Sequence, residues 1–143
     1  MMTNASFVNP AIRDSFKSNL PMHSPLLTVH CQSKDDDLGV RTLKPGDKFD
    51  FAFHENFLGT TCFYCIFDWG QNYNDFDVYY KIKKKSPCKY KLSFVADLYC
   101  TWLVKGSGIY LPRTPGVPFP DDFKLAYTWL KKDSAISLGE SFT

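Results

Sequence analysis

The stretch LLTVHCQSKDDDLGV, residues 26–40, alternates apolar and polar side chains, breaks at three consecutive aspartates and then resumes. Leu27, Val29 and Cys31 would lie on one face of an extended strand, while the polar residues between them lie on the other. Because β-strands place successive side chains on opposite faces, this pattern predicts a half-buried strand that ends in a turn.

The same alternation recurs along the chain, with Gly, Pro, Asn and Asp between the alternating runs. The runs are VRTL at 40–43, KFDFAFH at 48–54, TTCFYCIFDW at 60–69, FDVYYKIK at 76–83, YKLSFVA at 90–96, LYCTWLV at 98–104 and IYL at 109–111. The expected inward residues are Phe49, Phe51, Phe53, Phe63, Cys65, Phe67 and Trp69. This spacing of turns predicts an all-β, single-domain antiparallel β-sandwich of about 7–8 strands.

Length and charge exclude several classes of protein. The 143 residues are typical of one domain, and 44% of them are hydrophobic, which is enough to form a core. The formal net charge of +2 is small for a nucleic-acid-binding protein. No run approaches the roughly 18 apolar residues that a membrane-spanning helix needs. We therefore expect no nucleic-acid partner and no membrane insertion.

Five cysteines fall within the strand-rich part of the chain: Cys31, Cys62, Cys65, Cys88 and Cys100. Zinc sites use paired C-x-x-C motifs, but Cys62 and Cys65 form the only such pair, and on a strand they would face opposite sides. A thioredoxin-like motif would lie at a strand-to-helix turn instead. Disulfide bonds are the better interpretation, with no metal and no cofactor.

The two ends lack the alternating pattern. Residues 1–25 read as an irregular segment, and they contain no apolar region of the kind that a signal peptide needs. Residues 112–143 begin with a Pro-rich linker and continue into DDFKLAYTWLKKD, a short helix candidate with Asp121 or Asp122 as its cap. We expect this C-terminal tail to be dispensable for the sandwich.

The three aspartates could bind a metal, form a catalytic pair or shape a turn. They lack the spaced D-x-D-x-D-G pattern of a calcium loop, and no second carboxylate or base is placed to oppose them. The turn is therefore preferred: Asp36 or Asp37 accepts backbone N–H bonds, Leu38 returns to the core and Gly39 takes an unusual backbone conformation.

Catalysis has little support in the sequence. The three histidines are scattered, and no Ser or Cys sits in a motif that would pair it with a base. His30 could activate Cys62 in a Cys–His arrangement, but a surface histidine and a spare thiol explain both residues more simply. We expect no catalytic residues and no enzymatic activity.

Five segments together resemble one known family. LTVHCQSKDDDLGV, LKPGDKFDFAF, NFLGTTCFYCIFDW, FDVYY and CTWLVKGSGIYL occur in the order and at the spacing of the plant self-incompatibility S-protein homologues, which are small secreted β-sandwich proteins. The resemblance covers residues 26–111. It implies a secreted, extracellular signalling ligand that binds a cell-surface receptor protein in cell-to-cell recognition, such as the rejection of self pollen.

The resemblance also implies which cysteines are bonded. The family's cysteines map onto Cys31, Cys65, Cys88 and Cys100, which leaves Cys62 as a thiol. Of the three pairings that four cysteines allow, Cys31 with Cys100 and Cys65 with Cys88 is preferred here.

Partner choice is expected in loops that no motif constrains, because loops on a rigid scaffold commonly carry recognition. Apart from HENFLG at 54–59, the candidates for receptor contact are Asn72, Asn74 and Asp75 in GQNYND, and Lys83, Lys84 and Lys85 in KKKSPCKYK. These lysines could instead protect a strand edge from aggregation. We expect a monomer. The alternative function is an intracellular or leaderless β-sandwich interaction module.

Overall fold

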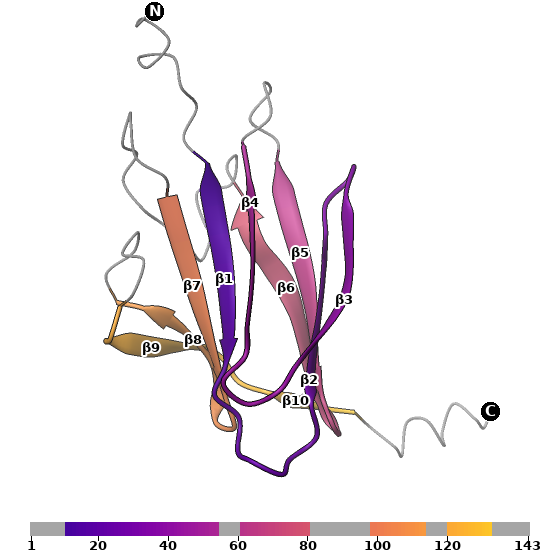
Figure 1. Cartoon of the computed structure of the whole chain (residues 1–143), viewed down its shortest axis with the longest axis vertical. Coiled ribbons are helices and arrows are strands. Elements are labelled where there is room, and N and C mark those ends of the chain that lie inside the picture. Colours follow the sequence, from indigo (N-terminus) through magenta and orange to yellow (C-terminus); the bar gives the residue numbers. More distant parts are fainter. Residues whose placement is uncertain (1–10, 55–60, 81–97, 114–119, 133–143) are drawn as a thin grey trace, which may run out of the picture.

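The computed structural model describes residues 11–54, 61–80, 98–113 and 120–132, which form two packed β-sheets (Figure 1). The strands are β1 Ile12–Ser18, β2 Leu27–Gln32, β3 Asp37–Leu43, β4 Lys48–Phe53, β5 Cys62–Trp69, β6 Asn72–Tyr80, β7 Leu98–Lys105, β8 Gly108–Pro112, β9 Phe123–Tyr127 and β10 Leu130–Lys131. One sheet has the order β4-β1-β7-β8-β9 and the other β10-β6-β5-β2-β3.

The predicted all-β sandwich is confirmed, with more strands and a more mixed topology than expected. The described residues contain ten strands. All strand pairs are antiparallel except β1 and β7, which run parallel. The inward faces predicted for β2 and β5 are confirmed at their centres. Leu27, Val29 and Cys31 are fully buried, and so are Cys65 and Phe67, which pair with Cys31 and Val29.

The N-terminal boundary is corrected by the structure. Residues 12–18, within the segment expected to be irregular, form β1, which lies between the edge strand β4 and the central strand β7 of its sheet. Its inward residues are Ile12, Asp14, Phe16 and Ser18, all buried. Two of these four are polar, so the apolar alternation that reveals other strands is absent here.

The C-terminal boundary is also corrected. No helix occurs among the described residues, and DDFKLAYTWLKKD forms β9 and β10, one strand in each sheet. The side chain of Tyr127 stacks on Phe76 with ring centroids 3.8 Å apart. Asp122, expected to cap a helix, instead accepts a hydrogen bond from Arg113 Nε at 3.1 Å. Residues 120–132 of the tail therefore belong to the sandwich, and the expectation that the tail is dispensable does not fit their packing.

A segment between β9 and β10 ties the two sheets together. The amide of Asn74 in β6 donates to the carbonyl of Thr128 at 2.7 Å. The indole of Trp129 packs on Trp69 of β5, with centroids 5.4 Å apart, and its N–H donates to the carbonyl of Lys105 in β7 at 2.8 Å. Since these contacts reach both sheets, we call residues 128–129 the strap.

The disulfide pairing differs from the preferred one. Cys31 is bonded to Cys65, because the two residues face each other across the antiparallel β2–β5 pair with Cα atoms 4.0 Å apart. Cys100 is disulfide-bonded as well, and Cys62 is a free thiol. The preferred bonds Cys31–Cys100 and Cys65–Cys88 are therefore both wrong. Cys88 lies outside the described residues, so its participation in a disulfide stays a prediction.

Candidate recognition surface

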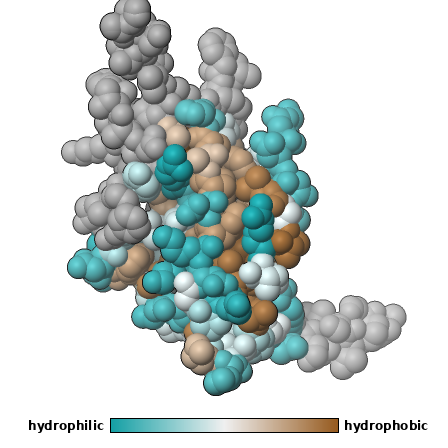
Figure 2. All heavy atoms as spheres, viewed as in Figure 1, coloured by the Kyte–Doolittle hydropathy of each residue, from teal (hydrophilic) through white to brown (hydrophobic). Residues whose placement is uncertain are grey.

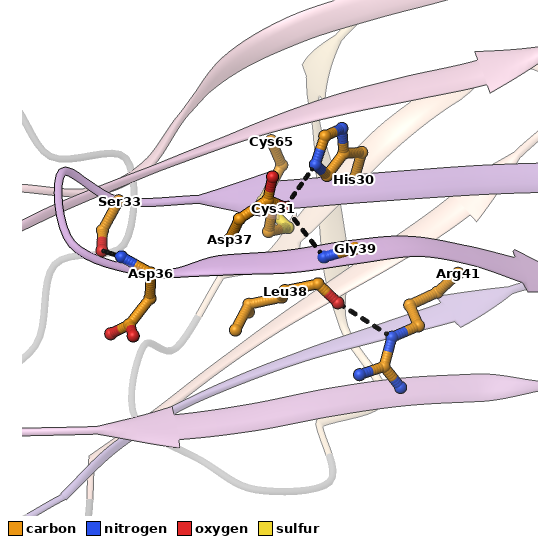
Figure 3. Close-up of polar contacts among 9 residues, drawn as sticks. All are labelled: His30, Cys31, Ser33, Asp36, Asp37, Leu38, Gly39, Arg41 and Cys65. Atoms are coloured by element: carbon orange, nitrogen blue, oxygen red, sulfur yellow. Dashed lines mark hydrogen bonds and ion pairs between the residues drawn. A yellow bond between two sulfur atoms is a disulfide. The ribbon is translucent and has the colours of Figure 1, made fainter.

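The hairpin that joins β2 and β3 is braced by the Asp37 carboxylate (Figure 3). Asp37 Oδ1 accepts the backbone N–H of Gly39 at 2.9 Å and lies 2.6 Å from Nε2 of His30. The bond from Gly39 has the larger effect and the bond with His30 the smaller, and together they hold the pKa of Asp37 below its ordinary value. Gly39 has a φ of 77°, which favours glycine. The aspartate motif thus shapes the hairpin, as expected, and the carboxylate that accepts is that of Asp37.

Asp36 takes part in the turn through its backbone. The N–H of Ser33 donates to the Asp36 carbonyl at 2.7 Å, and the Asp36 N–H donates to Ser33 Oγ at 3.1 Å. Leu38 is half-buried and packs against the core. The side chains of Asp35 and Asp36 are exposed, and Figure 3 shows that of Asp36 directed away from the bonds made by Asp37.

The segment GQNYND is mostly strand, which corrects its interpretation as a recognition loop. The turn is confined to residues 70–71, and β6 starts at Asn72, whose amide donates to the carbonyl of Trp69 at 3.1 Å. Asn74 is buried and bonded to the strap. Asp75 is exposed and accepts a hydrogen bond from the Tyr64 hydroxyl. Asn74 is therefore not available to a partner.

The other candidates for receptor contact cannot be placed. Lys83, Lys84 and Lys85 lie outside the described residues, as do residues 55–59 of HENFLG. Their proposed role stays a prediction.

The alternative of a Cys–His hydrolase does not fit the geometry. His30 lies opposite Ile66, and Cys62 is four residues further along β5, about 13 Å away at the usual rise per residue. The Cys62 thiol instead donates to Asp77 Oδ1 at 3.4 Å. Burial, followed by the charge of Asp77 and this bond, raises the pKa of Cys62 to about 11. A thiol with this pKa is protonated at neutral pH and is a poor nucleophile.

The described residues show no metal-binding cluster. No group of three or more His, Cys, Asp or Glu side chains in this part of the chain is placed to hold a metal ion. None of its segments forms a helix of the length and hydrophobicity needed to cross a membrane.

A hollow of about 450 Å³ opens beside the hairpin. It is lined by residues 32–36 of the β2–β3 turn, residues 53–54 at the end of β4 and residues 61–64 at the start of β5. It forms because the last residue of β2, Gln32, pairs with Tyr64, whereas β5 extends beyond this point to Cys62. We call it the end hollow.

Sequence reasoning did not find the end hollow. Phe53 and Phe63 read correctly as inward residues, and Tyr64 had no distinguishing pattern. The hollow results from the register between β2 and β5, which brings residues 32–36 beside residues 61–64. No local sequence signal reports such a register.

The fold and this surface together define a class of protein: a small disulfide-bonded β-sandwich with a braced hairpin at one end. A family model described as plant self-incompatibility protein S1 matches residues 15–129, and the chain belongs to this family. The match includes β9 and reaches the strap, in agreement with the corrected boundaries.

Individual relatives agree with this assignment. S-protein homolog 2 of Arabidopsis thaliana is 34% identical over 107 residues, 62% of this chain and 65% of the relative. S-protein homolog 24 of the same plant is 34% identical over 106 residues, 74% of this chain and 63% of the relative. The chain thus spans just under two thirds of these relatives.

A solved structure shares the fold. It is described as that of self-incompatibility protein homologues, "a widespread family of small, highly stable, secreted proteins from plants". The likeness covers 86% of this chain and 97% of the other, with a TM-score of 0.59 and 18% sequence identity.

Proposed function

We propose that this protein is a secreted signalling ligand, which binds a cell-surface receptor protein in cell-to-cell recognition of the self-incompatibility type. The observation that carries the proposal is the braced hairpin: the bonds of Asp37 and Ser33 fix the turn while Asp35 and Asp36 stay exposed. A surface that is ordered before binding loses less conformational freedom when a partner docks. Membership of a family of secreted proteins supports the extracellular location.

The same proposal includes a monomeric ligand without enzymatic activity. On the face shown in Figure 2, hydrophobic residues gather over β4 and β3, the outer strands of the two sheets. Arg41 of β3 covers part of this side: its guanidinium lies 4.8 Å from the centre of the Phe49 ring, and its Nε donates to the Leu38 carbonyl at 3.2 Å. Charged side chains on outer strands oppose edge-to-edge pairing between molecules.

Binding to intact cells tests this function. The labelled, oxidised protein should bind saturably to protoplasts from the plant of origin, and treatment of the cells with protease should remove the sites. Reduced and unfolded protein is the control, because it keeps the composition and loses the surface. Absence of saturable binding to protoplasts of any tissue, or accumulation of the expressed protein in the cytosol, would contradict the proposal.

A further inference from the structure

The end hollow has an aromatic floor. The rings of Phe53 and Phe63 lie 4.5 Å apart, and Phe53 is only partly buried. Phe53 also packs edge-on against Tyr79, at 5.1 Å. The volume of the end hollow, about 450 Å³, is within the usual range for ligand sites. Such a floor suits an apolar chain or a cation, because the face of an aromatic ring attracts positive charge.

The rim carries an excess of negative charge. The residues that line the hollow include two carboxylates, Asp35 and Asp36, against one lysine, Lys34, and one histidine, His54, so the formal charge is −1 with the histidine neutral. Neither carboxylate forms an ion pair with the described residues. A third carboxylate, Asp77, accepts the bond from Cys62, which is one of the lining residues. The charge of the rim therefore favours a cation over an anion.

The strand beside the hollow is suited to an extended chain. On the side of β2, β5 has no strand partner among the described residues beyond Tyr64, although it continues to Cys62. An extended peptide that pairs with a strand edge places alternate side chains in a neighbouring pocket.

From these three features we infer that the end hollow binds an arginine or lysine side chain of an extended segment of the partner. The apolar stem of that side chain lies on Phe53, and its charged end meets Asp35 and Asp36. The inference deepens the proposed function and rests on it only for the source of the segment, which is the receptor.

Peptide titrations followed by ¹H–¹⁵N NMR of the whole chain test the chemistry of the hollow. The probes are Ac-Ala-Arg-Ala-NH₂ and the same peptide with citrulline, which has the shape of arginine without its charge. The arginine peptide should shift the resonances of residues 32–36 and 61–64 and bind about tenfold more tightly than the citrulline peptide. Equal affinity of the two peptides, or shifts elsewhere on the molecule, would overturn the inference.

Charge variants refine the test. Asp35→Asn combined with Asp36→Asn should weaken the arginine peptide about tenfold, because it removes both carboxylates while the backbone bonds of the turn remain. Lys34→Gln should strengthen it about twofold. Asp121→Asn is the matched control, because Asp121 is exposed and lies outside the lining of the hollow, and it should have no effect. Free arginine that binds as tightly as the peptide would overturn the assignment to a polypeptide.

Binding to protoplasts separates this inference from the proposed function. The variant with both asparagines should lose most of its cell binding while the Asp121→Asn control keeps it. If both bind cells equally, the receptor does not use the hollow and the inference fails while the function stands. If the unmodified protein binds no cells but still discriminates between the peptides, the receptor function fails while the chemistry of the hollow stands.

Discussion

Replacing Asp14 by Asn should remove most of the pH dependence of folding stability between pH 4 and 8. Asp14 is fully buried in the centre of the sandwich, where its Oδ1 accepts the indole N–H of Trp102 at 3.2 Å. Its Oδ2 has no hydrogen-bond partner among the described residues. Burial raises the pKa of Asp14 from 3.8 to about 8, against the smaller opposing effect of the Trp102 bond. The folded protein therefore holds this carboxyl in its protonated form at neutral pH.

The sign follows from the two pKa values. The unfolded chain releases the proton near pH 3.8 and the folded chain near pH 8, so the folded state binds more protons in between. The stability associated with Asp14 is complete below the unfolded pKa and is lost as the pH rises through the folded pKa. At about 1.4 kcal/mol per pH unit, the loss by pH 7 amounts to about 4 kcal/mol. That is a large part of the stability of an ordinary domain.

The assay compares the two proteins instead of interpreting one curve. Urea denaturation of the oxidised wild type and of Asp14→Asn is followed by tryptophan fluorescence from pH 4 to 9. Asn keeps an oxygen that can accept the Trp102 N–H but cannot ionise, and all other titrating groups cancel in the difference. Asp14→Asn should be no more stable than the wild type at pH 4, and it should be more stable than the wild type at pH 8. Curves that stay parallel over this range would refute the reasoning.

Four further outcomes are expected. Asp37→Ala should lower the melting temperature more than Asp37→Asn, which can still accept the Gly39 N–H, and the advantage of the wild type over Asp37→Asn should vanish as the pH falls through the lowered pKa of Asp37. Trp129→Ala should destabilise the protein by about 2 kcal/mol in urea denaturation, because the strap loses its contact with Trp69 and its bond to Lys105. Arg41→Ala should produce concentration-dependent self-association in light scattering, since it uncovers the edge of β3. Cys62 should react with iodoacetamide about a hundredfold more slowly than an ordinary thiol, as measured by mass spectrometry, and Asp77→Asn should speed the reaction.

The sequence predicts the central strands well because their burial follows the alternation of side chains. Phe49, Phe63 and Phe67 were placed inward by period alone, and all three are buried. The alternation of apolar and polar residues did not reveal β1, because Asp14 and Ser18 occupy inward positions that are usually apolar. It also failed in the tail, where exposed Leu125 and Leu130 gave no alternating pattern.

The pairing of elements is what the sequence could not supply. Cys31 bonds Cys65 because β2 and β5 are neighbours in one register, and that adjacency is set by the whole sheet. The end hollow depends on the same register. Asn74 was predicted to be a loop residue, because its hydrogen bond to a carbonyl 54 residues away cannot be inferred from the neighbouring sequence. Local patterns thus define strands and turns, while long-range packing decides which of their residues meet.

The parallel pairing of β1 with β7 constrains when the chain can fold. β1 is made early, yet its place is between β4 and β7, and Trp102, whose indole donates to Asp14, follows 88 residues later. Contacts this distant in sequence form slowly, because a long loop must close first. A chain emerging from the ribosome therefore cannot complete this sheet until β7 has been synthesised. Under the extracellular location proposed above, that delay would keep the nascent polypeptide unfolded and able to thread through a translocation channel.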